Sequence, residues 1–124
     1  MEAILFAATA DAEASRQFYE TTLGFSCEAD TPFALVFDAA GTMLRVQKVE
    51  TVVNVPYTTI GFAVDNLPET VAELSAKGVQ FEFYEFMQQD EAGIWTTPDG
   101  TAVAWCKDPD GSLVSFTQHA QTQV

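Results

Sequence analysis

The chain's length, composition and charge exclude several classes of protein before any motif is considered. It has 124 residues, a hydrophobic share of 48%, and 18 acidic against 5 basic side chains, for a formal net charge of −13. This length fits one domain with a sizeable core, and the apolar content excludes a disordered chain. The negative charge opposes binding to nucleic acid or to an anionic membrane, whereas it attracts cationic ligands.

No segment predicts insertion into a membrane or export. No apolar run approaches the ~18 residues of a transmembrane helix. The apolar stretch 3–10 lacks the basic region that opens a signal peptide. The two cysteines, Cys27 and Cys106, have neither metal-site nor redox spacing. We therefore expect a soluble protein of the cytoplasm.

The first half of the chain predicts a βαβββ unit. A strand over Ile4–Thr9 leads to Asp11, a typical N-cap residue, and to a helix over 12–23. Gly24 ends that helix. Three short strands follow, over 25–29, 33–38 and 43–49, and a turn at 39–41 joins the last two.

The second half repeats this order after a linker over 51–57. A strand over 58–64 leads to a second helix, which ends at Gly78. Either Asp65 or Asn66 caps this helix. The remaining strands are expected over 79–86, 101–107 and 112–118, with a long loop over 87–100 and a tight turn at Asp108–Gly111.

Equal spacing in the two halves indicates an internal duplication. Asp11 and Gly24 are 13 positions apart, and so are Asp65 and Gly78. Further strands are expected after each helix, so each half has the same plan. We therefore divide the single domain, 1–124, into module one (about 1–50), the linker, module two (about 58–119) and a tail (120–124).

Three motifs resemble the vicinal oxygen chelate superfamily, which contains glyoxalases, bleomycin-resistance proteins and extradiol dioxygenases. They are the run Asp11–Tyr19 followed by Leu23-Gly24-Phe25, the Val64-Asp65-Asn66 opening of the second helix, and the turn Asp108–Gly111. The resemblance covers nearly the whole chain. It implies an α+β fold of two tandem βαβββ modules, which form a curved mixed sheet around a concave cleft. Helices lie on the outer face, and a second subunit often completes the cleft.

Enzymes of that superfamily commonly hold a divalent metal with His or Glu side chains from four strands. Carried over by position, the resemblance places these ligands at Ile4, at Arg45 or Gln47, at Thr59 and at Ser115. None of them supplies the imidazole and carboxylate donors that such a metal needs, and Arg45 would repel a cation. The single histidine, His119, follows the last strand and is expected to be a solvated tail residue.

Strand alternation predicts which side chains face the cleft. That face combines apolar walls with a few hydroxyls, one amide and one guanidinium, a composition that suits an organic ligand. It comprises Ile4, Phe6, Ala8, Met43, Arg45, Gln47, Thr59, Gly61, Ala63, Leu113, Ser115 and Thr117. The opposite face, expected to pack under the helices, comprises Leu5, Leu44, Val46, Ile60, Phe62, Val64, Val114 and Phe116.

The candidate ligand-binding residues are Phe6, Arg45, Gln47, Tyr57, Thr59, Trp95, Trp105 and Ser115. Arg45 either grips a carboxylate or phosphate through two hydrogen bonds or forms a salt bridge with one of the many acidic side chains. The two tryptophans either stack on a planar ligand or pack in the core or at a subunit interface. Tyr57 either offers a hydroxyl at the cleft mouth or anchors the linker.

Acid–base catalysis without a metal stays open as an alternative. It needs a side chain whose pKa lies near the working pH and which reaches the substrate. Glu82 and Glu85, which alternate with aromatic residues, are either such bases or solvated charges. Cys106 is either an inert buried thiol or a reactive one.

The residues and the resemblance together favour a metal-independent small-molecule-binding protein without a cofactor. We expect it to sequester an organic ligand in a cleft shared by the two subunits of a homodimer, and its acidity favours a cationic, antibiotic-like ligand. Metal-dependent glyoxalase I and extradiol dioxygenase activities are expected to be absent. One alternative is a metal-independent isomerase or lyase with a carboxylate or tyrosine base, so whether the protein is an enzyme stays open. Another is a catalytically empty interaction module.

Overall fold

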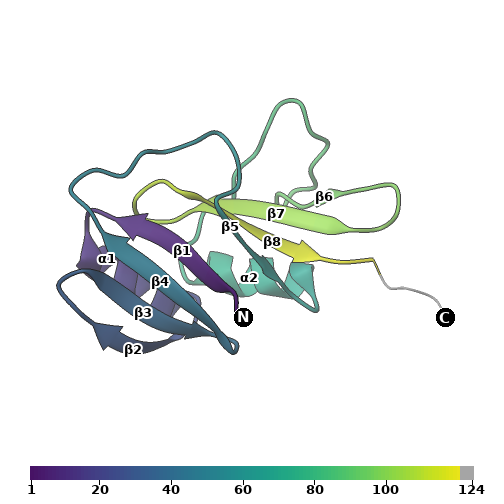
Figure 1. Ribbon diagram of the computed structural model, residues 1–124. Helices are drawn as coiled ribbons and strands as arrows, with labels where there is room; N and C mark the ends of the chain where they lie inside the picture. The colour runs from purple at the N-terminus through teal and green to yellow at the C-terminus, as the bar shows by residue number, and fades with distance from the viewer. Residues whose placement is uncertain (121–124) are drawn as a thin grey trace.

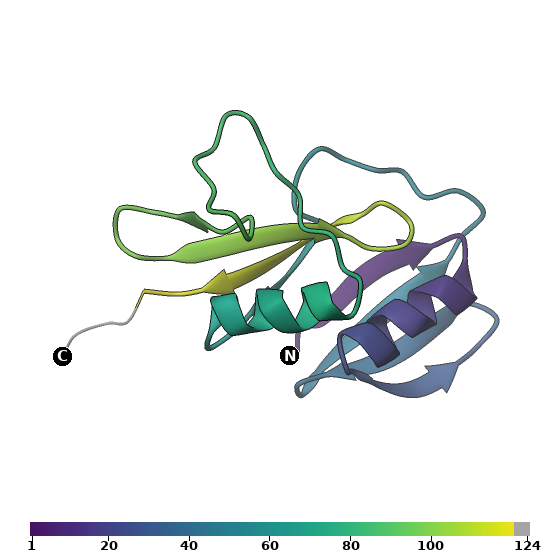
Figure 2. The ribbon, with the colours of Figure 1, turned by 180° about the vertical axis from the view of Figure 1, so that it is seen from behind.

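Two four-stranded sheets with helices behind them make up the fold of the computed structural model, which describes residues 1–120 (Figure 1). Both helices cover the same side of the molecule, as the view from behind shows (Figure 2). The fold is therefore α+β with two tandem βαβββ modules, as predicted. The strands form two separate sheets, which approach each other through β1 (Ile4–Thr9) and β5 (Ile60–Ala63).

The first sheet has the strand order β1-β4-β3-β2. Its other strands are β2 (Ser26–Asp30), β3 (Ala34–Ala39) and β4 (Thr42–Lys48). β1 runs parallel to β4, and β4 runs antiparallel to β3. The hairpin between β3 and β4 has two central residues, Ala40 and Gly41, with positive φ values of 53° and 94°. Positive φ at both positions is what a type I′ turn requires, and its twist matches that of the strands.

The second sheet repeats this order as β5-β8-β7-β6. It contains β6 (Trp95–Thr96), β7 (Ala102–Lys107) and β8 (Leu113–Gln118). β5 runs parallel to β8, and β7 runs antiparallel to β8. The predicted hairpin around Asp108–Gly111 is confirmed as the connection between β7 and β8.

The strand predicted over 79–86 is wrong. Phe81 makes one isolated bridge to β7, and the two-residue β6 takes the outer place in the sheet. The side chain of Gln89 explains the difference, because it accepts a hydrogen bond from the Tyr84 N–H (2.7 Å) and donates one to the Glu82 carbonyl (2.9 Å). A side chain thus satisfies backbone groups that a neighbouring strand would otherwise pair.

Each helix begins at a side-chain cap. Asp11 Oδ1 accepts a hydrogen bond from the Ala14 N–H (3.2 Å) before α1 (Ala12–Arg16). Asn66 Oδ1 accepts one from the Glu69 N–H (3.1 Å) before α2 (Leu67–Ala76). Of the two candidates for the second cap, the structure therefore selects Asn66. None of the helices within residues 1–120 is both long and apolar enough to cross a membrane.

The choice of Asn66 alters the spacing on which the duplication was inferred. The interval from cap to glycine is 13 positions in module one but 12 in module two, counted from Asn66 to Gly78. The first helix absorbs the extra residue, because α1 continues as the π-helix η1 (Gln17–Thr22). A π-helical turn holds one more residue than an α-helical turn. The duplication therefore rests on the shared topology rather than on equal spacing.

One hydrophobic cluster joins both modules beneath the helices. As predicted from strand alternation, Leu44, Val46, Ile60, Val114 and Phe116 are buried there. Leu5, Phe62 and Val64 are partly buried and pack against the cluster. The Phe25 and Phe62 rings, whose centroids are 5.2 Å apart, link the two modules directly.

The strands of the two modules lie within 4–48 and 60–118. The module and linker boundaries stay a prediction. The proposed tail, apart from Ala120, lies outside the described residues.

Candidate functional site: the sheet face

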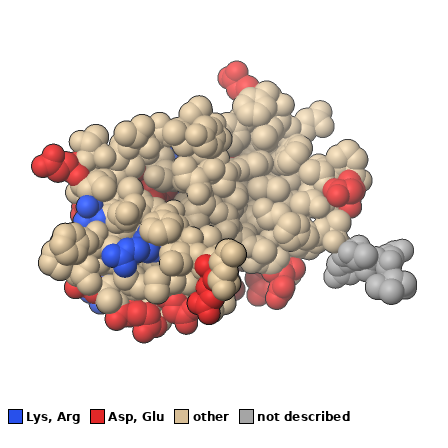
Figure 3. All heavy atoms as spheres, in the orientation of Figure 1, with Lys and Arg blue, Asp and Glu red and all other residues tan. Residues whose placement is uncertain are grey.

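Most side chains of the predicted cleft lie on the face of the two sheets opposite the helices, whereas Gly61 and Ala63 border a cavity on the helix side. Figure 3 shows this face as mostly uncharged, with acidic groups toward its margins and basic groups over the first sheet. The distribution is uneven for a chain with a formal net charge of −13. The sheet face is thus less acidic than the charge of the whole protein suggests.

Strand register shows which residues of the two modules are equivalent on the sheet face. Phe6 pairs with Arg45 between β1 and β4, and Gly61 pairs with Ser115 between β5 and β8. Phe6 lies five positions before the Asp11 cap, and Gly61 lies five before Asn66. Arg45 and Ser115 therefore occupy equivalent sites, so the register favours Arg45 over Gln47 as the fourth-strand position.

The residues at the four metal-ligand positions do not fit a divalent metal. Ile4, Arg45, Thr59 and Ser115 offer neither an imidazole nor a carboxylate, the donors that such an ion takes from a protein. Within residues 1–120, no three His, Cys, Asp or Glu side chains cluster so that they could hold a metal ion. His119 is exposed beyond the end of β8. The four positions therefore cannot supply the ligand set of a divalent metal.

Arg45 differs from the other four basic residues. Three of those form ion pairs and the fourth binds a backbone carbonyl: Arg16 and Lys48 with Asp30, Lys107 with Glu82, and Lys77 with Thr22. The half-buried Arg45 side chain makes no ion pair and no hydrogen bond within residues 1–120. The salt bridge considered from the sequence is therefore not found there. All the donor groups of this guanidinium are available to a ligand.

Three of the predicted residues border one pocket of about 280 Å³. Phe6 and Gln47 come from the first sheet, whereas Thr59 directly precedes β5 of the second. Residues 51–53 of the connecting segment also line it. Phe6 is 51% exposed, so the pocket is open to solvent. Arg45 does not line this pocket but pairs with Phe6 in the register, so it lies next to the three residues that do.

The two tryptophans lie in an aromatic cluster on the second sheet. Trp105 pairs with Ser115, so both side chains point to the sheet face. The Trp105 ring centroid is 6.2 Å from that of Trp95 and 5.8 Å from that of Tyr84, and its Nε1 donates a hydrogen bond to Thr58 Oγ1 (3.2 Å). Both indoles are half-buried, so they pack together and still present surface. Tyr57, which is 63% exposed, stands apart as a solvated side chain.

The candidate acid–base groups offer little support for catalysis. Glu82 binds Lys107 at 3.3 Å, and Glu85 is exposed. Burial and the nearby Glu82 carboxylate raise the pKa of Tyr84, which keeps its hydroxyl protonated at neutral pH. Burial raises the pKa of Cys106 to about 12. Of the two alternatives considered from the sequence, an inert buried thiol and a reactive one, the full burial of Cys106 favours the inert thiol.

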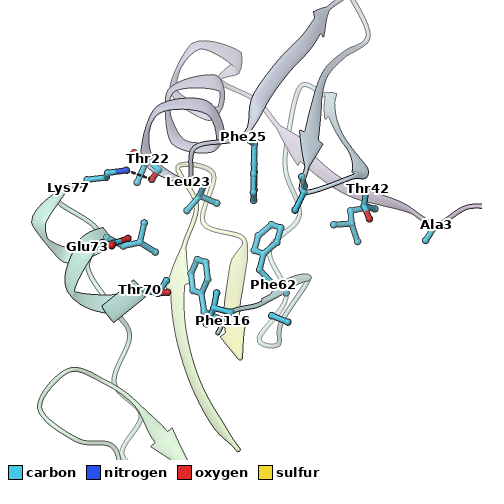
Figure 4. Close-up of a pocket in the computed structure, with 17 residues that line it drawn as sticks. Ala3, Thr22, Leu23, Phe25, Thr42, Phe62, Thr70, Glu73, Lys77 and Phe116 are labelled. Atoms are coloured by element: carbon cyan, nitrogen blue, oxygen red, sulfur yellow. Dashed lines mark hydrogen bonds between the residues drawn. The ribbon is translucent and has the colours of Figure 1, made fainter. Parts of the chain in front are cut away.

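A second and larger cavity, of about 500 Å³, lies on the helix side, where the modules meet (Figure 4). Leu23 and Phe25 line it from module one, and Phe62 and Phe116 from module two. Polar groups border it as well, including Thr22, Thr70, Glu73 and Lys77. None of the eight predicted site residues reaches this cavity. Strand alternation assigned Phe62 and Phe116 correctly to the inner face, but it could not show that the space between the modules stays partly unfilled.

The family comparison agrees with this architecture. The model of the Glyoxalase/Bleomycin resistance protein/Dioxygenase superfamily matches residues 4–116. The chain belongs to this superfamily. The resemblance inferred from the motifs is thereby confirmed. No curated protein matches the chain.

Solved structures of glyoxalase-superfamily proteins share the fold at low sequence identity. One is a glyoxalase/bleomycin resistance protein/dioxygenase from Alicyclobacillus acidocaldarius, with a TM-score of 0.73, 16% identity, and coverage of 98% of this chain and 92% of that chain. Another is a lactoylglutathione lyase from Agrobacterium tumefaciens, with a TM-score of 0.72, 19% identity, and coverage of 97% and 96%. A glyoxalase/bleomycin resistance protein from Streptomyces sp. CB03234 has a TM-score of 0.69, 22% identity, and coverage of 95% and 100%. At these identities the likeness shows the fold alone.

Proposed function

We propose that this superfamily member binds a small organic molecule at the sheet face without a metal. The observation that carries the proposal is the Arg45 guanidinium, which has no partner among residues 1–120 and stands at the position equivalent to Ser115. A guanidinium binds a carboxylate or phosphate through two parallel hydrogen bonds. Phe6 beside it supplies an apolar wall, and the indole of Trp105 offers a stacking surface on the second sheet.

The charge around Arg45 decides the sign of the ligand group that it binds. The formal net charge of −13 favours a cationic ligand, as expected from composition. Most acidic groups in view in Figure 3 lie toward the margins of the face, however, and salt screens exposed charges beyond about 8–10 Å. A guanidinium in direct contact outweighs them. We therefore assign the sheet face to an aromatic molecule with a carboxylate or phosphate, in place of a cationic antibiotic.

A second copy of the chain is the proposed partner that completes the site. The pocket of about 280 Å³ falls below the 300–1,000 Å³ that is usual for small-molecule sites. Phe6, which lines the pocket, is 51% exposed, and two more exposed apolar side chains follow on the same two strands, Ile4 (47%) and Met43 (44%). Covering them in a homodimer would bury apolar surface and deepen the pocket. The cytoplasmic location stays a prediction.

The experiment combines metal analysis with a thermal-shift measurement. We expect purified protein to contain less than stoichiometric zinc, nickel or iron, and 2-naphthoate to raise the melting temperature equally with and without EDTA. The Arg45→Gln variant should lose this shift, while Arg16→Gln, which removes a guanidinium on the first helix, should keep it. A stoichiometric metal, or a shift that EDTA abolishes, would refute the proposal. Turnover of a carboxylate substrate in EDTA would support a metal-independent isomerase or lyase instead.

A further inference from the structure

We propose that the helix-side cavity is a second binding site, separate from the sheet face, for a small aromatic amine. The cavity measures about 500 Å³, within the usual range for sites that hold a small molecule. Both modules line it, so a bound molecule would contact each of them. Neither Arg45 nor the tryptophans border it, which makes its occupancy independent of the function proposed above.

The floor of the cavity suits an aromatic body. Phe62 contacts Phe25 on one side, with ring centroids 5.2 Å apart, and Phe116 on the other, at 6.0 Å. Figure 4 shows the three rings lining the space beside Leu23. Phe25 and Phe62 are only partly buried, although they pack against the core. A planar apolar ligand would therefore remove ring surface from water and add ring-to-ring contacts.

The polar side of the cavity carries one acidic and one basic side chain, which do not form an ion pair with each other. Thr70 and Glu73 of α2 and Lys77, the C-cap residue of that helix, follow one another at helical spacing and line the same wall. Glu73 and Lys77, four positions apart, would ordinarily attract each other across one helical turn. Instead, the Lys77 ammonium donates a hydrogen bond to the Thr22 carbonyl (3.1 Å), drawn as a dashed line in Figure 4.

This arrangement leaves the Glu73 carboxylate open to a ligand. Its side chain makes no ion pair with any basic group in residues 1–120. The formal net charge of −13 adds to the local preference for a cation. An ammonium group on a short chain could reach Glu73 while its ring rests on Phe25 and Phe62. Lys77 lines the same wall, but its ammonium binds the Thr22 carbonyl, so the open Glu73 carboxylate and the net charge of the protein together favour an amine over an acid.

The test measures the affinity of the full chain for phenethylamine, by calorimetry and by NMR of the leucine methyl groups. Phenethyl alcohol and phenylacetate serve as matched neutral and acidic probes. We expect the amine to bind more tightly than the alcohol and the alcohol more tightly than the acid, with shifts at Leu23 and Leu74, which line the cavity. Glu73→Gln should weaken amine binding about threefold, the size of one exposed ion pair.

Three variants distinguish binding in this cavity from binding elsewhere on the protein. Glu69→Gln removes the same charge from α2 without bordering the cavity and should leave the affinity unchanged. Arg45→Gln should also leave it unchanged, whatever its effect on naphthoate. Thr70→Phe should abolish binding by filling the cavity. The proposal would be overturned if phenylacetate bound as tightly as phenethylamine, or if the two glutamate variants had equal effects. It would also be overturned if phenethylamine competed with self-association, because a second copy of the chain would then cover the cavity.

Discussion

The hydroxyl of Tyr19, on the first helix, donates a hydrogen bond of 2.9 Å to Asp108 Oδ2, in the turn before the last strand. Both residues are buried, Tyr19 fully and Asp108 with 5% of its surface exposed. They are 89 positions apart in the chain and belong to different modules. The contact therefore ties the two halves of the fold together through one polar pair.

The same turn makes further contacts with module one and the linker. Asp110 Oδ1 accepts a hydrogen bond from the Ala10 N–H (2.8 Å), and the Asn54 side chain donates one to the Asp110 carbonyl (3.1 Å). Asp108 Oδ1 accepts bonds from the N–H groups of Asp110 (3.0 Å) and Ser112 (2.9 Å), which hold the turn itself. The turn thus acts as a connector between modules as well as a hairpin.

Removing the Tyr19 hydroxyl should destabilise the protein. In Tyr19→Phe, Asp108 Oδ2 stays buried without its donor, and hydrogen bonds to charged groups contribute roughly 1.5–3 kcal/mol. We expect a loss of that size in the free energy of unfolding, measured by urea denaturation. The exposed Tyr57→Phe serves as the control and should change stability little. Equal stabilities of the two variants would show that the pair contributes nothing.

The buried Asp108 carboxyl should leave a signature in the pH dependence of stability. Burial raises its pKa in the folded state above the ordinary value of 3.8. The folded state then binds the proton of Asp108 more tightly than the unfolded state does, which stabilises the fold. This stabilisation is complete below pH 3.8 and is lost as the pH rises through the raised pKa. The stability of the wild type minus that of Asp108→Asn should therefore fall with rising pH and then level off. A difference that grows with pH would contradict the burial effect.

Alkaline pH should destabilise the protein through Cys106. Burial raises its folded pKa to about 12 from an ordinary value of 9.0. The unfolded thiol ionises first, so stability should be lost between those values, at up to about 1.4 kcal/mol per pH unit. In Cys106→Ala, the free energy of unfolding should therefore fall less steeply with pH. The two proteins are compared between pH ~9 and ~10, because Tyr19, whose pKa is also raised, contributes at higher pH. Identical pH slopes of the wild type and Cys106→Ala would show that burial does not raise the pKa of the Cys106 thiol.

The closeness of Gly61 to Ser115 predicts a coupled pair on the sheet face. A Cβ at position 61 would lie 2.6 Å from Ser115 Oγ, so Gly61→Ala must displace that hydroxyl. We expect a destabilisation of about 1 kcal/mol, the lower end of the overpacking range. In a Ser115→Ala background the same change should be nearly neutral. Additive effects of the two substitutions in a double-mutant cycle would show that the contact is not formed.

Local patterns in the sequence were sufficient for most of the fold. The caps at Asp11 and Asn66, the glycines that end the helices and the strand alternation all act over a few residues, so the elements could be placed from them. The strand expected over 79–86 failed because Gln89, several positions away, satisfies the backbone there. The π-helical turn at 17–22 likewise depends on how the helix packs, which spacing does not reveal.

The candidate site could be predicted only in part for the same reason. Alternation placed Phe6 and Arg45 on one face of the first sheet, and the strand register pairs these two residues. Whether Arg45 had a salt-bridge partner depended on which carboxylates lie nearby, and only the folded chain shows that. The Tyr19–Asp108 bond and the cavity between the modules join segments far apart in sequence, so no local pattern signals them.

The most direct test of metal-independent binding at the sheet face is titration calorimetry of EDTA-treated protein with 2-naphthoate. The wild type and Arg16→Gln should bind with equal affinity before and after chelation. Arg45→Gln should bind about tenfold or more weakly, because it loses a two-bond contact worth roughly 1.5–3 kcal/mol. Binding that requires a metal, or that Arg45→Gln leaves unchanged, would contradict metal-independent recognition by Arg45.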